Sequence, residues 1–352
     1  MNLSSKCFLI VSLFIAKMVL EICAKGDFHL LSKIKEGEFS EAELYLRTSN
    51  DCDDKKLLML PSYLKIASVH QPTYVQQSDK LILLDLTDKR VQEESIEAIK
   101  ITFDFLKRNN IPKLVLHCSS YDPREEKREI IIELANVVKS FFGQGIEVSF
   151  ETDMLGFNTY LPRRKLLTTL EDFKLLDHAL GGKLLITLDV EHISGTSVFN
   201  LVKENIDISK LNREQYYSTY LNFVGSNSSL VVDNFKNKLS SFIEAFRDKI
   251  SHIHLNGSDF KNYIIDPITT LPLIGEHLPL GYKNGNVQDR LNYSFIIEQF
   301  KKLPSNKEIK IVLELGIRKD KYDFHHEMYR SKLFLTRYLN TEERALIKNK
   351  EK

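Results

Sequence analysis

The chain has 352 residues, of which 43% are hydrophobic and 28% are charged, and its formal net charge is +1. A chain of this length and composition can bury a large core, which excludes a disordered chain, a collagen and a coiled coil as the overall class. The near-neutral charge provides no overall attraction to nucleic acid, so only a local basic groove could serve such a partner.

The N-terminus contains an apolar run, residues 7–16, that follows Lys6 and resembles a signal peptide. Because Lys17 and Glu21 interrupt this part of the chain, and because the alternating pattern described below requires a first strand, we expect a strand here instead. The four cysteines form no CxxC pair and indicate neither a zinc finger nor a disulfide scaffold. We therefore expect a cytoplasmic protein without a membrane span.

Short aliphatic or β-branched runs alternate with longer amphipathic stretches, a pattern typical of βα units around a parallel sheet. Eight such runs predict strands over residues 7–13, 42–46, 64–70, 113–117, 146–151, 184–192, 251–257 and 310–316. The stretches between them predict helices that include residues 95–107, 125–142 and 166–180. Eight strands with interposed helices predict a single-domain α/β fold, the (β/α)₈ or TIM barrel, over residues 1–320. A doubly wound open sheet usually has fewer strands, and its GxGxxG turn is missing.

Two segments depart from this regular alternation. Residues 193–249 are rich in Asn, Ser and Tyr before a helical run over residues 234–247, and we expect a loop insertion there on the active-site face. Residues 321–352 predict a C-terminal helix over residues 324–339 followed by a frayed, charged tail.

Ionisable residues stand at or near the ends of six of the eight predicted strands. A strand buried in a barrel should be apolar, so such a residue costs several kcal/mol unless it is paired or bound to a metal ion. The carboxyl ends of barrel strands converge on one face, where active sites lie. Each residue alone has a structural explanation, but imidazoles and carboxylates together form the ligand set for Zn²⁺, Mn²⁺ or Fe²⁺. The residues that predict this metal site are His70, His117, Glu151, Asp189, His192, His254 and Glu314.

The seventh strand and the loop after it carry further candidates. His252 and His254 lie on the same face of the strand because side chains alternate with a period of two. We expect His254, nearer the carboxyl end, to be the ligand and His252 to be buried behind it. The loop over residues 275–287 adds Glu276 and His277, which are either additional ligands or part of a surface turn. Surface positions are expected for His29, His178, His325 and His326.

These motifs, in this order, resemble the xylose-isomerase-like barrel superfamily, which contains the sugar and sugar-phosphate isomerases and epimerases and the family 2 AP endonucleases. The resemblance runs from the first strand to about Arg318. The matching segments are SVHQP (68–72), VLH (115–117), VSFE (148–151), LDVEH (188–192), HIHLNGS (252–258), EHLPLGYKNGN (276–286) and VLELG (312–316).

In the isomerase and epimerase branch, the resemblance implies one divalent ion, Zn, Mn, Mg or Co, bound by Glu151, Asp189, His254 and Glu314. It also implies that the two glutamates are the acid/base pair next to the sugar carbonyl and that His192 contacts the substrate. The ion would polarise the substrate oxygens and stabilise an enediolate-like state.

In the AP-endonuclease branch, the resemblance implies three zinc ions. His70 and His117 would join Glu151 around the second ion, and His192 and His277 would hold the third. That branch has an aspartate two residues before the loop histidine, where this chain has Gly275, so Glu276 would have to substitute from the adjacent position. The Asn that commonly follows the fifth-strand glutamate is also replaced, here by Thr152.

Three functions stay open, and we favour the first. It is a metal-dependent isomerase or epimerase acting on a small carbohydrate, as a monomer or an oligomer. The second is a multi-zinc phosphodiesterase acting on DNA, for which the basic run over residues 163–165 could contact phosphates or could equally be a solvated helix start. The third is a barrel without catalytic activity, used for binding or regulation.

Overall fold

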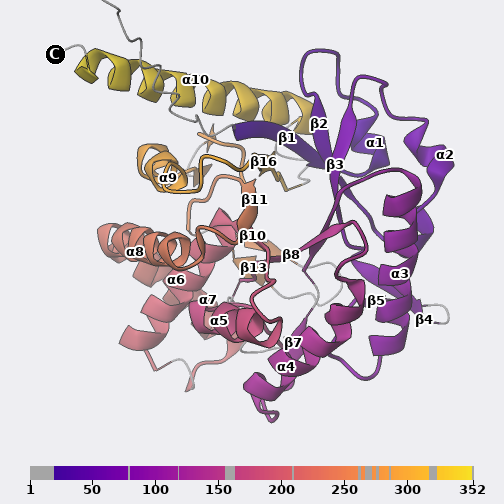
Figure 1. The fold of residues 1–352 in the computed structure, drawn as a ribbon. Coiled ribbons are helices and arrows are strands. Elements are labelled where there is room, and N and C mark those ends of the chain that lie inside the picture. Colours follow the sequence, from indigo (N-terminus) through magenta and orange to yellow (C-terminus); the bar gives the residue numbers. More distant parts are fainter. Residues whose placement is uncertain are drawn as a thin grey trace, which may run out of the picture.

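The structure is a computed structural model that describes residues 20–77, 80–117, 119–154, 163–207, 210–260, 263–265, 272–274, 277–284, 287–316 and 323–350. In these residues, eight parallel strands close into a barrel in the order β1, β16, β11, β10, β8, β6, β3, β2, which confirms the predicted (β/α)₈ barrel (Figure 1). The barrel strands are β1 (Leu20–Gly26), β2 (Glu41–Tyr45), β3 (Lys65–His70), β6 (Lys113–Leu116), β8 (Glu147–Glu151), β10 (Ile186–Asp189), β11 (Ile250–Leu255) and β16 (Ile309–Leu313).

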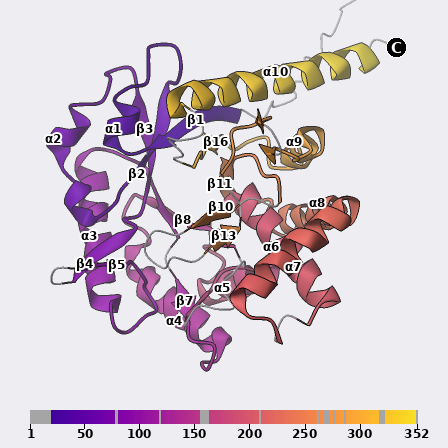
Figure 2. The same cartoon turned by 180° about the vertical axis from the view of Figure 1, so that it is seen from behind.

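Helices surround the barrel and connect its strands (Figures 1 and 2). They are α1 (Phe28–Leu31), α2 (Asp54–Leu57), α3 (Gln92–Arg108), α4 (Lys127–Val138), α5 (Leu170–Ala179), α6 (Val190–Asn205), α7 (Arg213–Ser226), α8 (Ser228–Phe246), α9 (Tyr293–Phe300) and α10 (Phe324–Lys350), with the 3₁₀ turns η1 (Ser49–Asp51) and η2 (Lys139–Phe141). Two-stranded antiparallel sheets decorate the loops: β4 (Tyr74–Gln77) with β5 (Lys80–Leu83), β7 (Ser120–Tyr121) with β9 (Arg164–Lys165), β12 (Tyr263–Ile265) with β13 (Pro272–Ile274), and β14 (Lys283–Asn284) with β15 (Val287–Gln288).

Helix α3 shows why the amphipathic stretches form helices that pack on the barrel. Its buried residues recur at helical spacing and include Ala98, Ile99, Phe103 and Leu106. Acidic residues occupy its first turn and basic residues its last turn, which complements the helix dipole.

The predicted first strand, residues 7–13, is wrong, because the barrel closes with β1 instead and residues 7–13 lie outside the described residues. β1 contains Glu21 and Lys25. Because charged residues are unusual in a buried strand, the sequence pattern does not predict a strand at this position. Both charges are paired inside the fold: Glu21 contacts Lys310 at 2.6 Å, and Lys25 contacts Glu314 at 2.8 Å. Because β1 closes the barrel, the fold requires no strand over residues 7–16, and this removes the reason for preferring a strand to a targeting signal there.

The expected loop insertion within residues 193–249 is also wrong, since the structure has helices α6, α7 and α8 there. Some of the Asn, Ser and Tyr residues that suggested a loop are helix caps or buried contacts. The Asn212 side chain caps α7 by accepting from the Gln215 amide, and Tyr216 and Tyr220 are fully buried. Small residues in the middle of α6, among them Gly195, let this helix pack closely against Met154 and α8.

The C-terminal helix begins at Phe324, as predicted, but α10 continues to Lys350, so the expected frayed tail after residue 339 is wrong. It packs on α9 and β16, and its Met328 and Leu335 side chains are buried (Figure 1). No helix in the described part of the chain is both long enough and apolar enough to cross a membrane.

Candidate metal centre

The predicted site residues stand at the carboxyl ends of the barrel strands. His70, Glu151 and Asp189 are the last residues of β3, β8 and β10. His117 and Glu314 directly follow β6 and β16, and His254 lies in β11. The strand predicted over residues 184–192 stops at Asp189, so His192 lies in the first turn of α6. The fold thus brings residues that are distant in sequence to one end of the barrel.

Glu151, Asp189, His254 and Glu314, the metal core, offer ligand atoms that all lie within 4.8 Å of one another. The Nδ1 atom of His254 is 3.3 Å from Glu151 Oε2, 3.0 Å from Glu314 Oε2 and 4.0 Å from Asp189 Oδ2. Each of these four atoms is buried and has no hydrogen-bond partner among the described residues, although Glu314 Oε2 forms an ion pair with Lys25 Nζ at 2.8 Å. Buried polar atoms are rarely left without partners, and three carboxylates with one imidazole suit a divalent ion, so the residues fit a metal at this point.

The remaining oxygen of Asp189 has a structural role. Asp189 Oδ1 accepts a hydrogen bond from the His192 amide at 2.8 Å and caps α6, whereas Oδ2 faces the metal core. Capping and metal binding therefore do not compete for the same atom.

The charges in the metal core depend strongly on one another. Burial raises the pKa of Glu151 and of Glu314, but the positive charges of His254, Lys25 and nearby histidines outweigh burial and hold both pKa values well below their usual range. Burial and Lys25 lower the pKa of His254, but the surrounding carboxylates raise it well above its usual value. In the absence of a metal ion, a protonated His254 thus partly balances the carboxylates.

A second cluster adjoins the metal core and consists of His70, His117 and Glu151. His70 Nε2 is 3.3 Å from Glu151 Oε2, and its Nδ1 is 3.1 Å from the Gln71 carbonyl oxygen. Because that carbonyl only accepts, Nδ1 carries the proton and Nε2 keeps its lone pair toward Glu151. His117 is less available as a metal ligand than His70, because its Nε2 already lies 3.0 Å from Asp153 Oδ1.

A third cluster also shares a residue with the metal core and consists of Asp189, His192 and His277. The Thr152 carbonyl oxygen accepts from Nδ1 of His192 at 2.7 Å, so Nε2 is the acceptor in the neutral ring. Burial lowers the pKa of His192, but the surrounding carboxylates raise it to about 9, so an ion at this point would have to displace a proton. Thr152, at the position that departs from the motif, therefore orients a candidate ligand through its backbone. Gly275 and Glu276 lie outside the described residues, so the substitution expected of Glu276 stays a prediction.

The burial of the other histidines can be compared with the predictions made for them. His252 is fully buried behind His254, as expected. His29, His178 and His326 are exposed, and His325 is half-buried.

Three charged residues beside the clusters were missed in the sequence. Lys25 was missed because its strand was misplaced. Glu43 lies in a correctly predicted strand but is not at its end, and only the inward direction of its side chain distinguishes it. Glu191 stands between the motif residues Asp189 and His192, inside the strand predicted over residues 184–192, and nothing in the sequence distinguishes it as a site residue.

Glu191 is fully buried, and neither of its carboxylate oxygens has a hydrogen-bond partner in the described part of the chain. Its Oε2 lies 3.9 Å from His277 Nε2. Burial, reinforced by the charges of Asp189 and Glu314, raises the pKa of Glu191 to about 8, although His192 opposes this shift. This carboxyl group therefore differs from the two ionised glutamates of the metal core.

No protein-family model and no curated protein sequence matches this chain. Solved structures do match. A D-tagatose 3-epimerase-like protein has a TM-score of 0.53 and 16% identity, over 93% of this chain and 99% of that chain. A family 2 AP endonuclease from Brucella melitensis has a TM-score of 0.51 and 13% identity, over 85% of this chain and 93% of that chain.

A xylose isomerase domain protein from Alicyclobacillus acidocaldarius has a TM-score of 0.51 and 12% identity, over 91% of this chain and 98% of that chain. Identities this low establish the fold and leave the reaction open. The chain therefore has the fold of the xylose-isomerase-like barrels, as its motifs predicted.

Proposed function

We propose that this chain is a divalent-metal-dependent isomerase or epimerase that moves a proton next to the carbonyl of a sugar, a sugar phosphate or a polyol-derived keto compound. The observation that supports it most is the metal core, in which four buried ligand atoms without hydrogen-bond partners among the described residues face one point. The shared fold with a D-tagatose 3-epimerase-like protein supports the same class of substrate.

In this proposal the ion is held by Glu151, Asp189, His254 and Glu314. When bound, a divalent ion withdraws electron density from the carbonyl and hydroxyl oxygens of the substrate. Glu151 and Glu314 are the proton carriers, and their low pKa values keep them ionised and able to accept a proton at neutral pH. The Glu314 side chain is 20% exposed and that of Glu151 only 1%, so Glu314 is the one nearer the opening of the site.

The test is proton exchange with solvent. Metal-loaded protein is incubated in deuterated water with a panel of ketoses, aldoses and their phosphates, and incorporation of deuterium next to the carbonyl is measured by NMR. Glu314→Gln should abolish exchange, whereas Glu171→Gln, which changes an exposed side chain on α5, should not. Failure of the metal-loaded wild type to exchange a C–H proton of any compound would refute the proposal.

A multi-zinc phosphodiesterase is the second candidate, and one observation favours it. The second and third clusters each share a carboxylate with the metal core, and His70 and His192 both present Nε2 because a backbone carbonyl accepts from their Nδ1. Such an arrangement suits more than one ion.

The basic run over residues 163–165 supports this candidate less than its charge suggests. Arg163 contacts Asp88 at 3.5 Å, and Lys165 contacts Asp153 at 3.2 Å, so acidic groups already neutralise two of its charges. The run includes β9 rather than a helix start, since α5 begins only at Leu170.

Metal stoichiometry separates the candidates. One ion per chain supports sugar chemistry, and two or three ions with cleavage of a duplex containing an abasic site would favour the phosphodiesterase. A wild-type chain that binds no ion after reconstitution would support the barrel without catalytic activity.

A further inference from the structure

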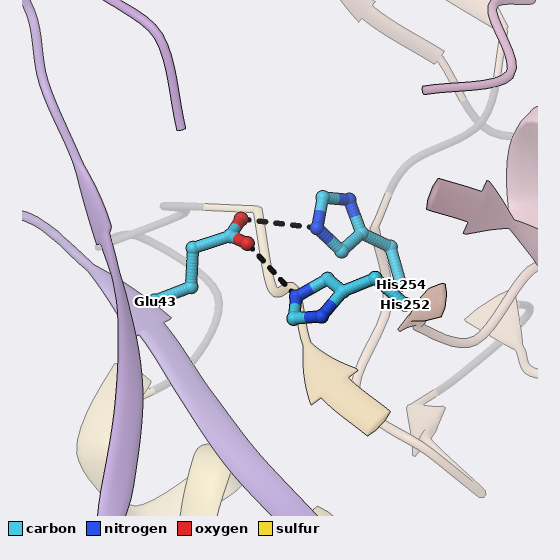
Figure 3. A group of neighbouring side chains, drawn as sticks. All are labelled: Glu43, His252 and His254. Carbon is cyan, nitrogen blue, oxygen red and sulfur yellow. Dashed lines mark hydrogen bonds and ion pairs between the residues drawn. The ribbon is translucent and has the colours of Figure 1, made fainter. Parts of the chain in front are cut away.

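We propose that Glu43 is a positioning residue that orients the His254 ring, so that Nδ1 of this ring is presented to the metal ion of the proposed site. This inference rests on the proposed metal-dependent function and extends it to a residue that no ligand motif includes. Glu43 lies on β2, across the barrel interior from His252 and His254 on β11 (Figure 3).

Glu43 is completely enclosed, and its two oxygens divide the contacts between them. Oε2 accepts from Ser68 Oγ at 2.8 Å and lies 3.0 Å from His252 Nε2. Oε1 lies 3.0 Å from His254 Nε2, off the ideal hydrogen-bond axis, and 3.4 Å from Lys25 Nζ. Figure 3 shows the carboxylate directed at both rings, one oxygen to each.

These contacts determine which nitrogen of His254 can bind a cation. A carboxylate beside an ammonium group, with two donors on its other oxygen, acts as an acceptor. The neutral His254 ring that would bind an ion therefore directs its Nε2–H toward Glu43 and keeps its lone pair on Nδ1. That nitrogen is the one that faces Glu151, Asp189 and Glu314. A carboxylate behind a metal-binding histidine fixes the tautomer and the ring orientation in this way.

His252 and Ser68 contact Glu43 and are not ligands of the proposed metal ion. Both bind Oε2, and this keeps Oε1 turned toward His254. His252 lies two residues before His254 in β11, so its side chain points to the same face but further from the carboxyl end of the strand. It therefore cannot reach the metal core, but it can fix the orientation of the Glu43 carboxylate.

Glu43, His252 and His254 could instead form a metal site of their own, since their ligand atoms also lie within 4.8 Å of one another. Lys25 argues against this alternative. Its ammonium group lies against Glu43 Oε1 and also contacts Glu314 Oε2 at 2.8 Å, so a positive charge already stands beside the group. The same charge also stands beside Glu314 of the metal core, but three carboxylates offset it there, whereas Glu43 is the only carboxylate of this group.

The test compares Glu43→Gln with Asp172→Asn. Both remove the charge of a buried carboxylate with little change in shape. Among the described residues, the polar partners of the Asp172 carboxylate are the backbone amides of residues 168 and 169, the Thr168 hydroxyl and Lys127, none of which belongs to the metal core. The affinity for Zn²⁺ is measured by competition with a chromophoric chelator, ions per chain by mass spectrometry, and ligand geometry from the visible spectrum of the Co²⁺ form. Circular dichroism reports the fold.

Glu43→Gln should weaken Zn²⁺ binding about 10- to 100-fold and change the Co²⁺ spectrum, without changing the number of ions at saturation. Asp172→Asn should leave the affinity and the spectrum unchanged even where it lowers the unfolding temperature. His252→Gln should show a smaller loss than Glu43→Gln. If Glu43→Gln does not fold, Glu43→Asp serves instead and should bind Zn²⁺ more weakly than the wild type.

Unchanged affinity in the Glu43 variant, beside normal binding by the wild type, would overturn this inference and leave the proposed function standing. Loss of one ion per chain in both the Glu43 and His252 variants would show that the group binds an ion itself and would overturn the positioning role. A wild-type chain that binds no ion would refute the proposed function together with this inference.

Discussion

Replacement of Glu191 by Gln should remove a large pH dependence from the stability of the metal-free protein. The pKa of this buried carboxyl group is raised from 4.5 to about 8. Between these pH values the folded chain keeps a proton that the unfolded chain releases, so the free energy of unfolding falls as the pH rises and then stays level above pH 8. The corresponding loss is at most about 5 kcal/mol.

Gln cannot ionise, so Glu191→Gln should gain stability relative to the wild type as the pH rises from 5 to 9. The assay is urea unfolding at several pH values, followed by circular dichroism, with a chelator present so that no metal ion stabilises the ionised form. Glu171→Gln, on the exposed face of α5, is the matched control and should follow the wild type. A constant difference between Glu191→Gln and the wild type across this pH range would refute the reasoning.

Three further predictions concern the site and its supports. Glu314→Gln should abolish the proton exchange proposed above while the circular dichroism spectrum stays unchanged, and activity in this variant would exclude Glu314 as a proton carrier. Lys25→Met should destabilise the metal-free protein by about 3–5 kcal/mol because it leaves Glu43 and Glu314 without their counter-ion, and added Zn²⁺ should restore part of that loss. Thermal unfolding with and without Zn²⁺ measures both effects, and an unchanged midpoint would contradict them. Gly195→Ala should cost about 1–3 kcal/mol in urea unfolding, because a Cβ there would lie 2.9 Å from Met154 Cγ and closer still to its sulfur. A neutral effect would mean that Met154 moves aside freely.

Much of the barrel could be predicted because its strands are short apolar runs in regular alternation with helices. Seven of the eight predicted strands coincide with barrel strands to within three residues at either end. β1 could not be found this way, since Glu21 and Lys25 are polar in sequence and become acceptable in a strand only through partners near the other end of the chain.

The candidate site, too, could be predicted only in part, because the burial of some of its charged residues is visible only in the fold. Ionisable residues at strand ends interrupt an apolar pattern, and this drew attention to residues such as His70 and Glu151. Glu43 and Glu191 also lie inside predicted strands, but neither is the last residue of its strand, and acidic residues are common in exposed strands and helix starts. Only the packing of β2 and α6 shows that these carboxyl groups are buried.

The seam between β1 and β16 has a consequence for how the chain folds as it is synthesised. Leu20 pairs with Ile309, and the ion pair between Glu21 and Lys310 spans 289 residues. Until the ribosome has released β16, the edges of β1 and β11 have no partner strand between them, and such open edges can pair with other chains. Glu314 emerges directly after β16, so the strand that closes the barrel also delivers the last residue of the metal core. A nascent chain therefore cannot acquire the complete site before it has nearly finished its barrel.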